Sequence, residues 1–288
     1  MKIGVIYPQT ELQGDPRAVE RIGLAAEELG YEHLLAYDHV LGATHDREPK
    51  LQGPYTEKQP FHDPLMMFAY LAGITRRIEF VTGVLILPQR QTALVARQAA
   101  DLDLLSHERL RLGVGIGWNY VEYGSLGQDF HRRGARLGEQ VGLLRRLWSE
   151  PLVDFAGAFD RIERAALNPR PRRVIPIWVG GFADVALRRA AALADGFIFA
   201  HGAGDAFALA ARLRQFLKEA GRSESGFGLH CNMIQAKSPR DVIETAARWR
   251  DIGGTHASVV TMGRNLKTIE EHIDYLRAVA DAIRGAGL

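Results

Sequence analysis

Residues 78–118 decide the fold, and they read IEFVTGVLILPQRQTALVARQAADLDLLSHERLRLGVGIGW. Residues 78–82 form a short run of β-branched and aromatic side chains, which is typical of a strand. Residues 92–105 carry a helical pattern, and residues 110–114 form a second apolar run of strand length. A strand, a helix and a strand in this order predict two parallel strands joined by a crossover helix.

The same alternation continues along all 288 residues of the chain. Short apolar runs predict eight strands, at residues 3–7, 33–37, 78–82, 110–114, 176–179, 197–199, 227–234 and 256–261. Helical patterns lie at residues 16–30, 92–105, 132–148, 184–194, 206–220, 239–252 and 268–283. This count predicts an α/β fold of a single domain, a (β/α)8 TIM barrel over residues 1–288. A doubly wound open sheet is the alternative, but Tyr7, Pro8 and Gln9 follow the first strand in place of its glycine fingerprint.

The composition sets limits on location and partners. Charged residues make up 24% of the chain and the net charge is +2, which indicates no basic surface for nucleic acid. Cys231 is the only cysteine, so no internal disulfide can form and a reducing cytoplasm is expected. No signal-peptide pattern precedes the first strand, and no run of about 18 apolar residues predicts a membrane span. We therefore expect a cytoplasmic protein that binds neither nucleic acid nor membrane.

Two connections are longer than the others. Residues 41–63 follow the second strand, so they lie at the carboxyl-terminal face of the barrel, where we predict a lid loop. Residues 150–173 precede the fifth strand and begin at the opposite face. Within them, residues 153–159 have the pattern of a small hairpin, which we expect to contribute to packing and not to chemistry.

Asp38 and His39 are the candidate acid and base. They follow the second strand, and catalytic groups of such barrels come from the carboxyl ends of the strands and the loops after them. A histidine beside a carboxylate can titrate near neutral pH and transfer protons. The structural alternative for this pair is a turn or a hydrogen-bonded surface pair.

Glycines follow two other strands. Gly180 and Gly181 lie between the fifth strand and its helix, where backbone N–H groups can bind an anion, although such a turn also needs glycine for its backbone angles. Three alternating glycines, the last of them Gly117, end the fourth strand before Trp118. These glycines either leave room for a planar group or relieve crowding inside the barrel. Trp118 either stacks on a ring or covers the barrel.

Metal and hydrolase chemistry lack their usual residues. Metal-dependent barrels need several ligands that converge from different strands, and the ten histidines are scattered without a close pair such as His-x-His. No Gly-x-Ser-x-Gly turn occurs, which argues against a Ser-His-Asp hydrolase. We therefore expect no metal.

Several segments of the chain resemble luciferase-like monooxygenases, and most closely the branch that depends on coenzyme F420. These segments are residues 83–88, 96–106, 109–118, 123–139 and 176–181. The resemblance covers roughly residues 1–285 and implies a flavin or deazaflavin ring over the strand ends of a (β/α)8 barrel. It places Asp38 and His39 near the reactive edge of the ring, and it suggests a homodimer. The cofactor-binding positions that it implies are Gly83 and Val84, joined by a cis peptide bond, Gly117, Trp118 and Glu122, and Gly180, Gly181 and Phe182 on the phosphate side.

Three functions stay open at this point. The first is a coenzyme F420-dependent oxidoreductase that transfers hydride to or from a small organic substrate, with His39 as the proton donor or acceptor. The second is an FMN-dependent monooxygenase, and the third is a flavin-binding barrel without catalysis, against which Asp38 and His39 argue. The insertion that some relatives have after the seventh strand is short here, so the sequence names no substrate.

Overall fold

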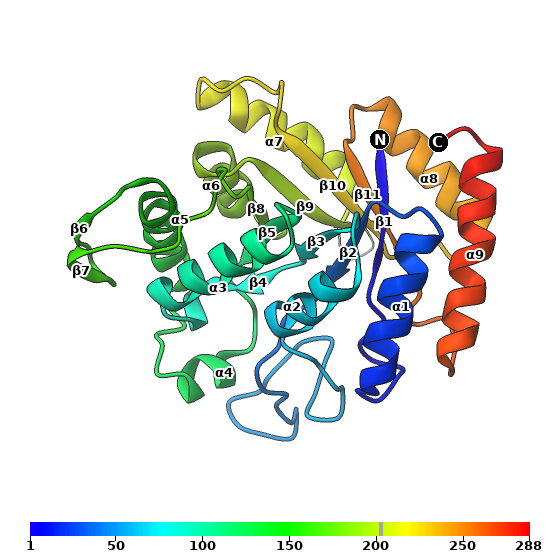
Figure 1. Ribbon diagram of the computed structural model, residues 1–288, viewed down its shortest axis with the longest axis horizontal. Coiled ribbons are helices and arrows are strands. Elements are labelled where there is room, and N and C mark those ends of the chain that lie inside the picture. The colour runs from blue at the N-terminus through cyan, green and yellow to red at the C-terminus, as the bar shows by residue number, and fades with distance from the viewer. Residues whose placement is uncertain (202–203) are drawn as a thin grey trace.

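Eight parallel strands close into a barrel, which confirms the predicted (β/α)8 fold (Figure 1). The computed structural model describes residues 1–201 and 204–288. The barrel strands, in their order around the barrel, are β1 (Lys2–Ile6), β2 (His33–Ala36), β3 (Glu79–Thr82), β5 (Leu110–Gly115), β8 (Ile177–Gly180), β9 (Gly196–His201), β10 (Gly228–Met233) and β11 (His256–Val260). The last strand pairs with the first, and Ile3 lies opposite Ala257.

Helices cover the outside of the barrel (Figure 1). The longer ones are α1 (Pro16–Glu28), α2 (Pro64–Ile74), α3 (Thr92–Leu105), α5 (Arg133–Ser149), α6 (Asp184–Leu193), α7 (Ala206–Glu219), α8 (Pro239–Asp251) and α9 (Ile269–Gly285). Three short elements extend the ends of β3 and β5, namely β4 (Leu85–Ile86), the 3-10 helix η1 (Leu87–Gln89) and α4 (Tyr120–Ser125).

The helices begin at residues whose side chains cap them. The Asp15 carboxylate accepts a hydrogen bond from the backbone N–H of Arg17, and Pro16 occupies the first turn of α1. Ser238 forms a capping box with Asp241 at the start of α8. The starts of α1 and α8 predicted from Asp15 and Ser238 are therefore confirmed.

Helix α2 is the one long helix without a predicted counterpart. Its sequence, PLMMFAYLAGI, contains no charged residue, so it has no polar face from which a helical period could be read. Asp63 caps it by accepting hydrogen bonds from the N–H groups of Leu65 and Met66. The acidic cap followed by Pro64 is a helix-start signal that the sequence does carry.

The two long connections differ in structure. Residues 37–63, between β2 and α2, contain neither helix nor strand. The second connection forms an antiparallel hairpin of β6 (Val153–Ala156) and β7 (Arg161–Ala165), which is longer than the predicted residues 153–159 and projects from the barrel beside α5 (Figure 1). Its turn is held by Glu139 of α5, whose carboxylate accepts hydrogen bonds from the N–H groups of Ala158, Phe159 and Asp160.

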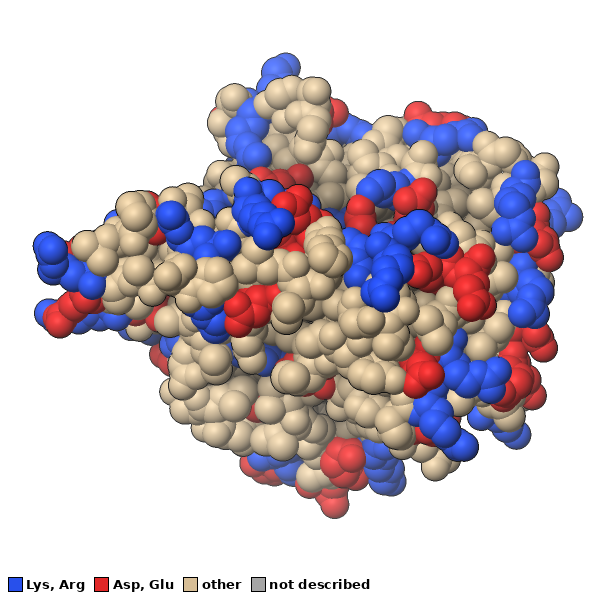
Figure 2. Space-filling model, viewed as in Figure 1, with Lys and Arg blue, Asp and Glu red and all other residues tan. Residues whose placement is uncertain are grey.

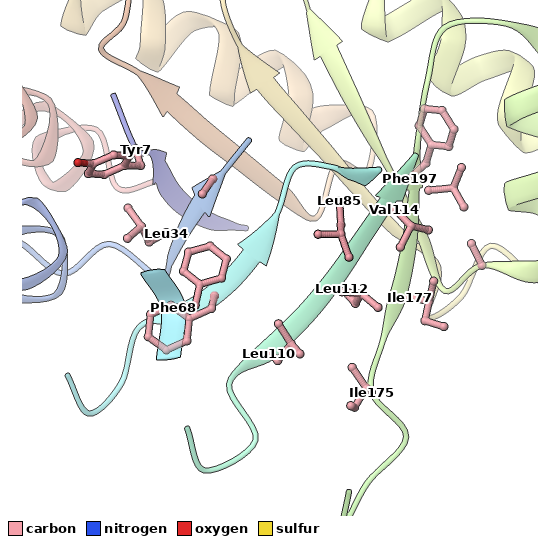
Figure 3. Packing of buried hydrophobic residues seen from close by; sticks show 14 of the residues in the cluster. Tyr7, Leu34, Phe68, Leu85, Leu110, Leu112, Val114, Ile175, Ile177 and Phe197 are labelled. Atoms are coloured by element: carbon pink, nitrogen blue, oxygen red, sulfur yellow. The ribbon is translucent and has the colours of Figure 1, made fainter. Parts of the chain in front are cut away.

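Apolar side chains fill two regions of the core. One lies inside the barrel and consists of Ile6, Leu35, Val81, Trp178, Ile198 and Val260. The larger one lies between the strands and the helices (Figure 3). There Leu112 of β5 lies opposite Ile177 of β8, and Phe68 of α2 stacks on Phe80 of β3 at a centroid distance of 5.1 Å. These layers hold the strand ends that form the site.

The surface carries charges of both signs. Lys and Arg side chains alternate with Asp and Glu over the face that Figure 2 shows. Some of them form ion pairs between neighbouring helices, such as Arg188 with Glu219 at 2.7 Å. Within the described residues, no helix is long and apolar enough to cross a membrane.

Candidate active site

A cavity of about 420 Å³ opens at the carboxyl ends of β2, β3, β5 and β8. Its lining includes these predicted site residues: Asp38, His39, Gly83, Val84, Gly117, Trp118, Gly180, Gly181 and Phe182. The structure thus brings together every predicted site residue except Glu122, which lies behind His39 and is buried. The lid loop adds Tyr55 to the same cavity.

The carboxylate of Glu122 orients the His39 ring. Nδ1 of His39 lies 3.3 Å from both carboxylate oxygens of Glu122. Oε1 of Glu122 also accepts hydrogen bonds from the backbone N–H groups of Val40 at 2.8 Å and Leu41 at 3.0 Å. A carboxylate at Nδ1 favours the tautomer with the proton on that nitrogen, so Nε2 is left as the exchangeable position. Nε2 has no hydrogen-bond partner among the described residues.

Glu122 stays ionised despite its burial. Burial raises the pKa of this carboxyl group, but the hydrogen bonds from His39, Leu41 and Gln89 outweigh it and the pKa lies below its usual value. Glu122 is therefore a charged hydrogen-bond acceptor for Nδ1 of His39.

Asp38 is not the hydrogen-bond partner of its neighbour His39. Its carboxylate is fully enclosed and accepts hydrogen bonds from the N–H of Ile86 at 2.8 Å and from Arg90 at 2.8 Å. Arg90 also binds Asp63, the cap of α2, at 3.0 Å. Asp38 thus ties the loop after β2 to β4 and to the end of the lid, while His39 faces the cavity.

The floor of the cavity is built around Val84. The peptide bond between Gly83 and Val84 is cis, as predicted. The Val84 side chain packs between two glycines: an added Cβ at Gly115 would lie 2.4 Å from its Cγ2, and one at Gly180 would lie 2.7 Å from its Cγ1. Of the two interpretations of the strand-end glycines, relief of crowding therefore holds at Gly115. Gly117 has a φ of +61°, a conformation that favours glycine.

The end of the cavity away from His39, next to α6, can bind an anion. Gly180, Gly181 and Phe182 lead into α6, and no side chain caps the start of this helix. The N–H groups of Ala186 and Leu187 donate to the carbonyl of Ala183, and the N–H groups that precede them could bind a phosphate. Arg189 of α6 lines the same end and forms no ion pair or hydrogen bond with the described residues. Burial lowers the pKa of its guanidinium group.

Sequence reasoning missed several of these residues. Arg189 and Ile198 lie within regular elements, where nothing in the local sequence marks a residue that faces a ligand. Tyr55 lies in the lid, whose path over the barrel no local pattern predicts. The spacing between His39 and Glu122 is likewise set by the barrel and not by the nearby sequence.

Comparisons with known proteins agree with this geometry. The family model for luciferase-like monooxygenases matches residues 1–283. A protein of Mycobacterium tuberculosis strain H37Rv, itself uncharacterised, is 33% identical over 272 residues, which are 90% of this chain and 92% of that one. The coenzyme F420-dependent glucose-6-phosphate dehydrogenase of Gordonia bronchialis is 30% identical over 269 residues, covering 88% of this chain and 75% of the relative.

A solved structure shares the fold over the whole chain. The crystal structure of monooxygenase RslO1 from Streptomyces bottropensis superposes with a TM-score of 0.83 at 19% identity and covers 100% of both chains. The family match spans nearly the whole barrel, including every strand end that lines the cavity. The chain therefore belongs to the luciferase-like monooxygenase family.

Proposed function

We propose that the protein is a coenzyme F420-dependent oxidoreductase that transfers hydride to or from a small organic substrate. The observation that carries this proposal is the His39 ring at the cavity, held by Glu122 through Nδ1 while Nε2 has no partner among the described residues. A bound deazaflavin would supply the carbon that gives or takes the hydride. The protein would then position the substrate and move one proton.

The residues around the cavity fit a planar cofactor with an anionic tail. Val84, Gly115 and Gly180 form a floor without polar side chains, against which a flat ring can lie. Gly181, Phe182 and the first turn of α6 would bind the phosphate through backbone N–H groups, and Arg189 would add a positive charge. Gly117 and Trp118 would border the ring from β5.

His39 would act as the general acid or base. Oxidation of an alcohol releases the hydroxyl proton, and reduction of a carbonyl group requires one, so either direction needs a proton partner at the substrate oxygen. Nε2 of His39 is the group in the cavity that can fill this role. Glu122 would be a positioning residue, and Asp38 would hold the lid through Arg90 and would not transfer protons.

An FMN-dependent monooxygenase is the second candidate, because the description of the matching family names that activity. We place it second because the Gordonia relative, whose name states coenzyme F420, aligns with most of this chain. A flavin-binding barrel without catalysis comes last, since it would not need an oriented histidine in the cavity.

Titration with both cofactors tests the proposal. Each would be added to the purified chain while the fluorescence and absorbance of the cofactor are followed. We expect saturable binding of oxidised coenzyme F420 that is tighter than the binding of FMN. Tight binding of FMN without any response to coenzyme F420 would reject the deazaflavin and favour the monooxygenase.

Location and assembly are two further proposals. The single cysteine, Cys231, is buried and supports a cytoplasmic location. Met66 and Tyr70 expose apolar surface on α2, which supports a homodimer. Light scattering of the purified protein tests the dimer, and a monomer at micromolar concentration would reject it.

A further inference from the structure

Four aromatic rings meet at the His39 end of the cavity. The centroid of the His39 ring lies 4.8 Å from that of Phe61, 5.5 Å from that of Tyr55 and 5.5 Å from that of Trp118. Tyr55 and Phe61 contact each other at 4.9 Å, and all these pairs are edge-to-face. His39, Tyr55 and Trp118 line the cavity, and Phe61 packs behind two of them. We call these four residues the aromatic wall.

Contacts between the lid and α4 hold the aromatic wall in place. Gly53 lies against the indole of Trp118 so closely that an added Cβ would be 2.2 Å from a ring atom. The Tyr120 hydroxyl donates a hydrogen bond to the carbonyl of Pro49, and the Asn119 amide donates one to the carbonyl of Leu41 at 3.2 Å. These contacts join the lid, which carries Tyr55 and Phe61, to the segment that carries Trp118.

Asp38, the charged residue of the cavity lining next to His39, is already paired. Asp38 is enclosed and bound to Arg90, and Arg90 is shared with Asp63. Arg189, the unpaired cation among the described lining residues, lies on α6 at the other end, and β3 and β5 separate β2 from β8 in the barrel. Among the described residues that line the cavity, no Lys or Arg at the His39 end can pair with a phosphate or carboxylate.

The two tyrosines that line this end are neutral. Burial, with a smaller contribution from Glu11, raises the pKa of Tyr55 to about 12. Burial also raises the pKa of Tyr37, which lines the cavity next to Asp38. Both phenols stay protonated, so this end offers hydroxyl groups and ring faces to a ligand.

We infer that the substrate is an uncharged, planar compound, an aryl or cyclic alkenyl ketone or the matching secondary alcohol, held by the aromatic wall. This inference rests on the proposed function, because only that function places the reacting oxygen beside Nε2 of His39. A ring that enters here meets the faces and edges of aromatic side chains, which favour offset or edge-to-face contacts. A sugar phosphate would bring negative charge to an end without a cation to receive it, at a high cost in desolvation.

Calorimetric titration of the full chain, with and without coenzyme F420, tests the inference. The probes are acetophenone, an uncharged aryl ketone, and glucose 1-phosphate, an anion. We expect acetophenone to bind measurably in both states and the sugar phosphate not to bind at the His39 end. Tyr55→Ala should weaken the binding of acetophenone roughly 2- to 10-fold, because an aromatic contact is lost. The matched control Tyr70→Ala removes an exposed tyrosine of α2 outside the cavity and should leave the affinity unchanged.

Tryptophan fluorescence locates the binding. Trp118 lines the cavity, while Trp148, Trp178 and Trp249 are at most 5% exposed. Acetophenone should change the emission of the wild type, and Trp118→Phe should lose most of this change. Tyr55→Arg should reverse the preference, so that the sugar phosphate binds and acetophenone is weakened.

The outcomes separate this inference from the proposed function. Tighter binding of the sugar phosphate to the wild type, no binding of acetophenone, or an unchanged affinity in Tyr55→Ala would overturn the inference while cofactor titration still supports the function. Failure of coenzyme F420 to bind would overturn the proposed function. The inference about the substrate would then fall as well, even if acetophenone binds to the cavity.

Discussion

The orientation of His39 depends on a carboxylate that lies far along the chain. Glu122 is contributed by α4, and it reaches the loop after β2 because β2 and β5 flank β3 in the barrel. The sequence placed Asp38 and His39 at the correct face, and both line the cavity. It could not show that their side chains diverge, because the orientation of adjacent loop residues depends on partners from other strands.

Replacement of His39 by alanine should remove the proton-transfer group and spare the cofactor. We expect turnover to fall by about 10²–10⁴-fold, with cofactor affinity nearly intact and one limb of the pH–rate profile lost. Steady-state kinetics over a range of pH measure the turnover and the pH–rate profile. A cofactor titration of the same variant measures the affinity for the cofactor. If His39→Ala keeps near-full turnover on an active substrate, the acid–base role is wrong.

Glu122→Gln keeps the size of the side chain and removes its charge. The His39 ring then loses the carboxylate that favours its proton on Nδ1, so Nε2 is no longer fixed as the exchangeable position. Turnover at neutral pH should fall roughly 10- to 100-fold, the size of effect seen when partners that orient a functional histidine are removed. Turnover equal to that of the wild type would show that Glu122 only braces the loop.

Arg189→Gln removes the cation that lines the α6 end of the cavity and has no partner among the described residues. Cofactor affinity should fall roughly tenfold or more, because hydrogen bonds to charged groups contribute about 1.5–3 kcal/mol. Arg188→Gln is the matched control, since the adjacent Arg188 is exposed and pairs with Glu219. Equal affinities for the wild type and Arg189→Gln in fluorescence titration would place the anionic tail elsewhere.

At the scale of elements, the regular alternation of the chain predicted the barrel strands and most helices. Helix α2 was missed because its side chains are apolar all round, and the hairpin was underestimated because β7 carries exposed polar residues without an alternating pattern. The interior glycines were ambiguous for a related reason. The sequence shows which residues of β5 lack a Cβ atom, but it does not show that Val84, between β3 and β4, fills the space at Gly115.

The packing of Val84 on β5 predicts the effect of a single methyl group. In Gly115→Ala the new Cβ would lie 2.4 Å from Cγ2 of Val84, and the free energy of unfolding should fall by about 1–3 kcal/mol. Gly142→Ala is the control, because this exposed glycine of α5 has no atom near its added Cβ, and it should gain up to about 1 kcal/mol. Denaturant unfolding measures both, and an unchanged stability of Gly115→Ala would contradict the packing.

At the scale of the whole molecule, the amino-terminal end of the barrel holds a cluster of buried histidines. Nε2 of His33 and Nε2 of His230 both lie within 2.8 Å of the Ser258 hydroxyl. Burial, with the nearby Arg111, lowers the pKa of His256 to about 2, and burial also holds the pKa values of His33 and His230 well below their usual range. All three histidines are therefore neutral in the folded protein at ordinary pH.

This cluster makes stability depend on pH. In the unfolded chain these histidines protonate near pH 6.5, while the folded protein keeps them neutral, so the unfolded state binds more protons below that pH. The free energy of unfolding should fall as the pH falls, by up to about 1.4 kcal/mol per pH unit for each histidine. Denaturant unfolding between about pH 5 and about pH 7.5 measures the slope. His256→Asn should reduce this slope, and a slope unaffected by the variant would contradict the neutral state of His256.

Oxygen consumption during turnover distinguishes the two proposed reactions, because hydride transfer needs no oxygen and monooxygenation does. An uncharged secondary alcohol and oxidised coenzyme F420 would be mixed with the protein in the absence of air, and the amount of reduced cofactor would be compared with the amount of ketone formed. We expect one reduced cofactor for each ketone without air, and no oxygen uptake when air is admitted. Turnover that occurs only with reduced FMN, together with oxygen uptake, would contradict this expectation.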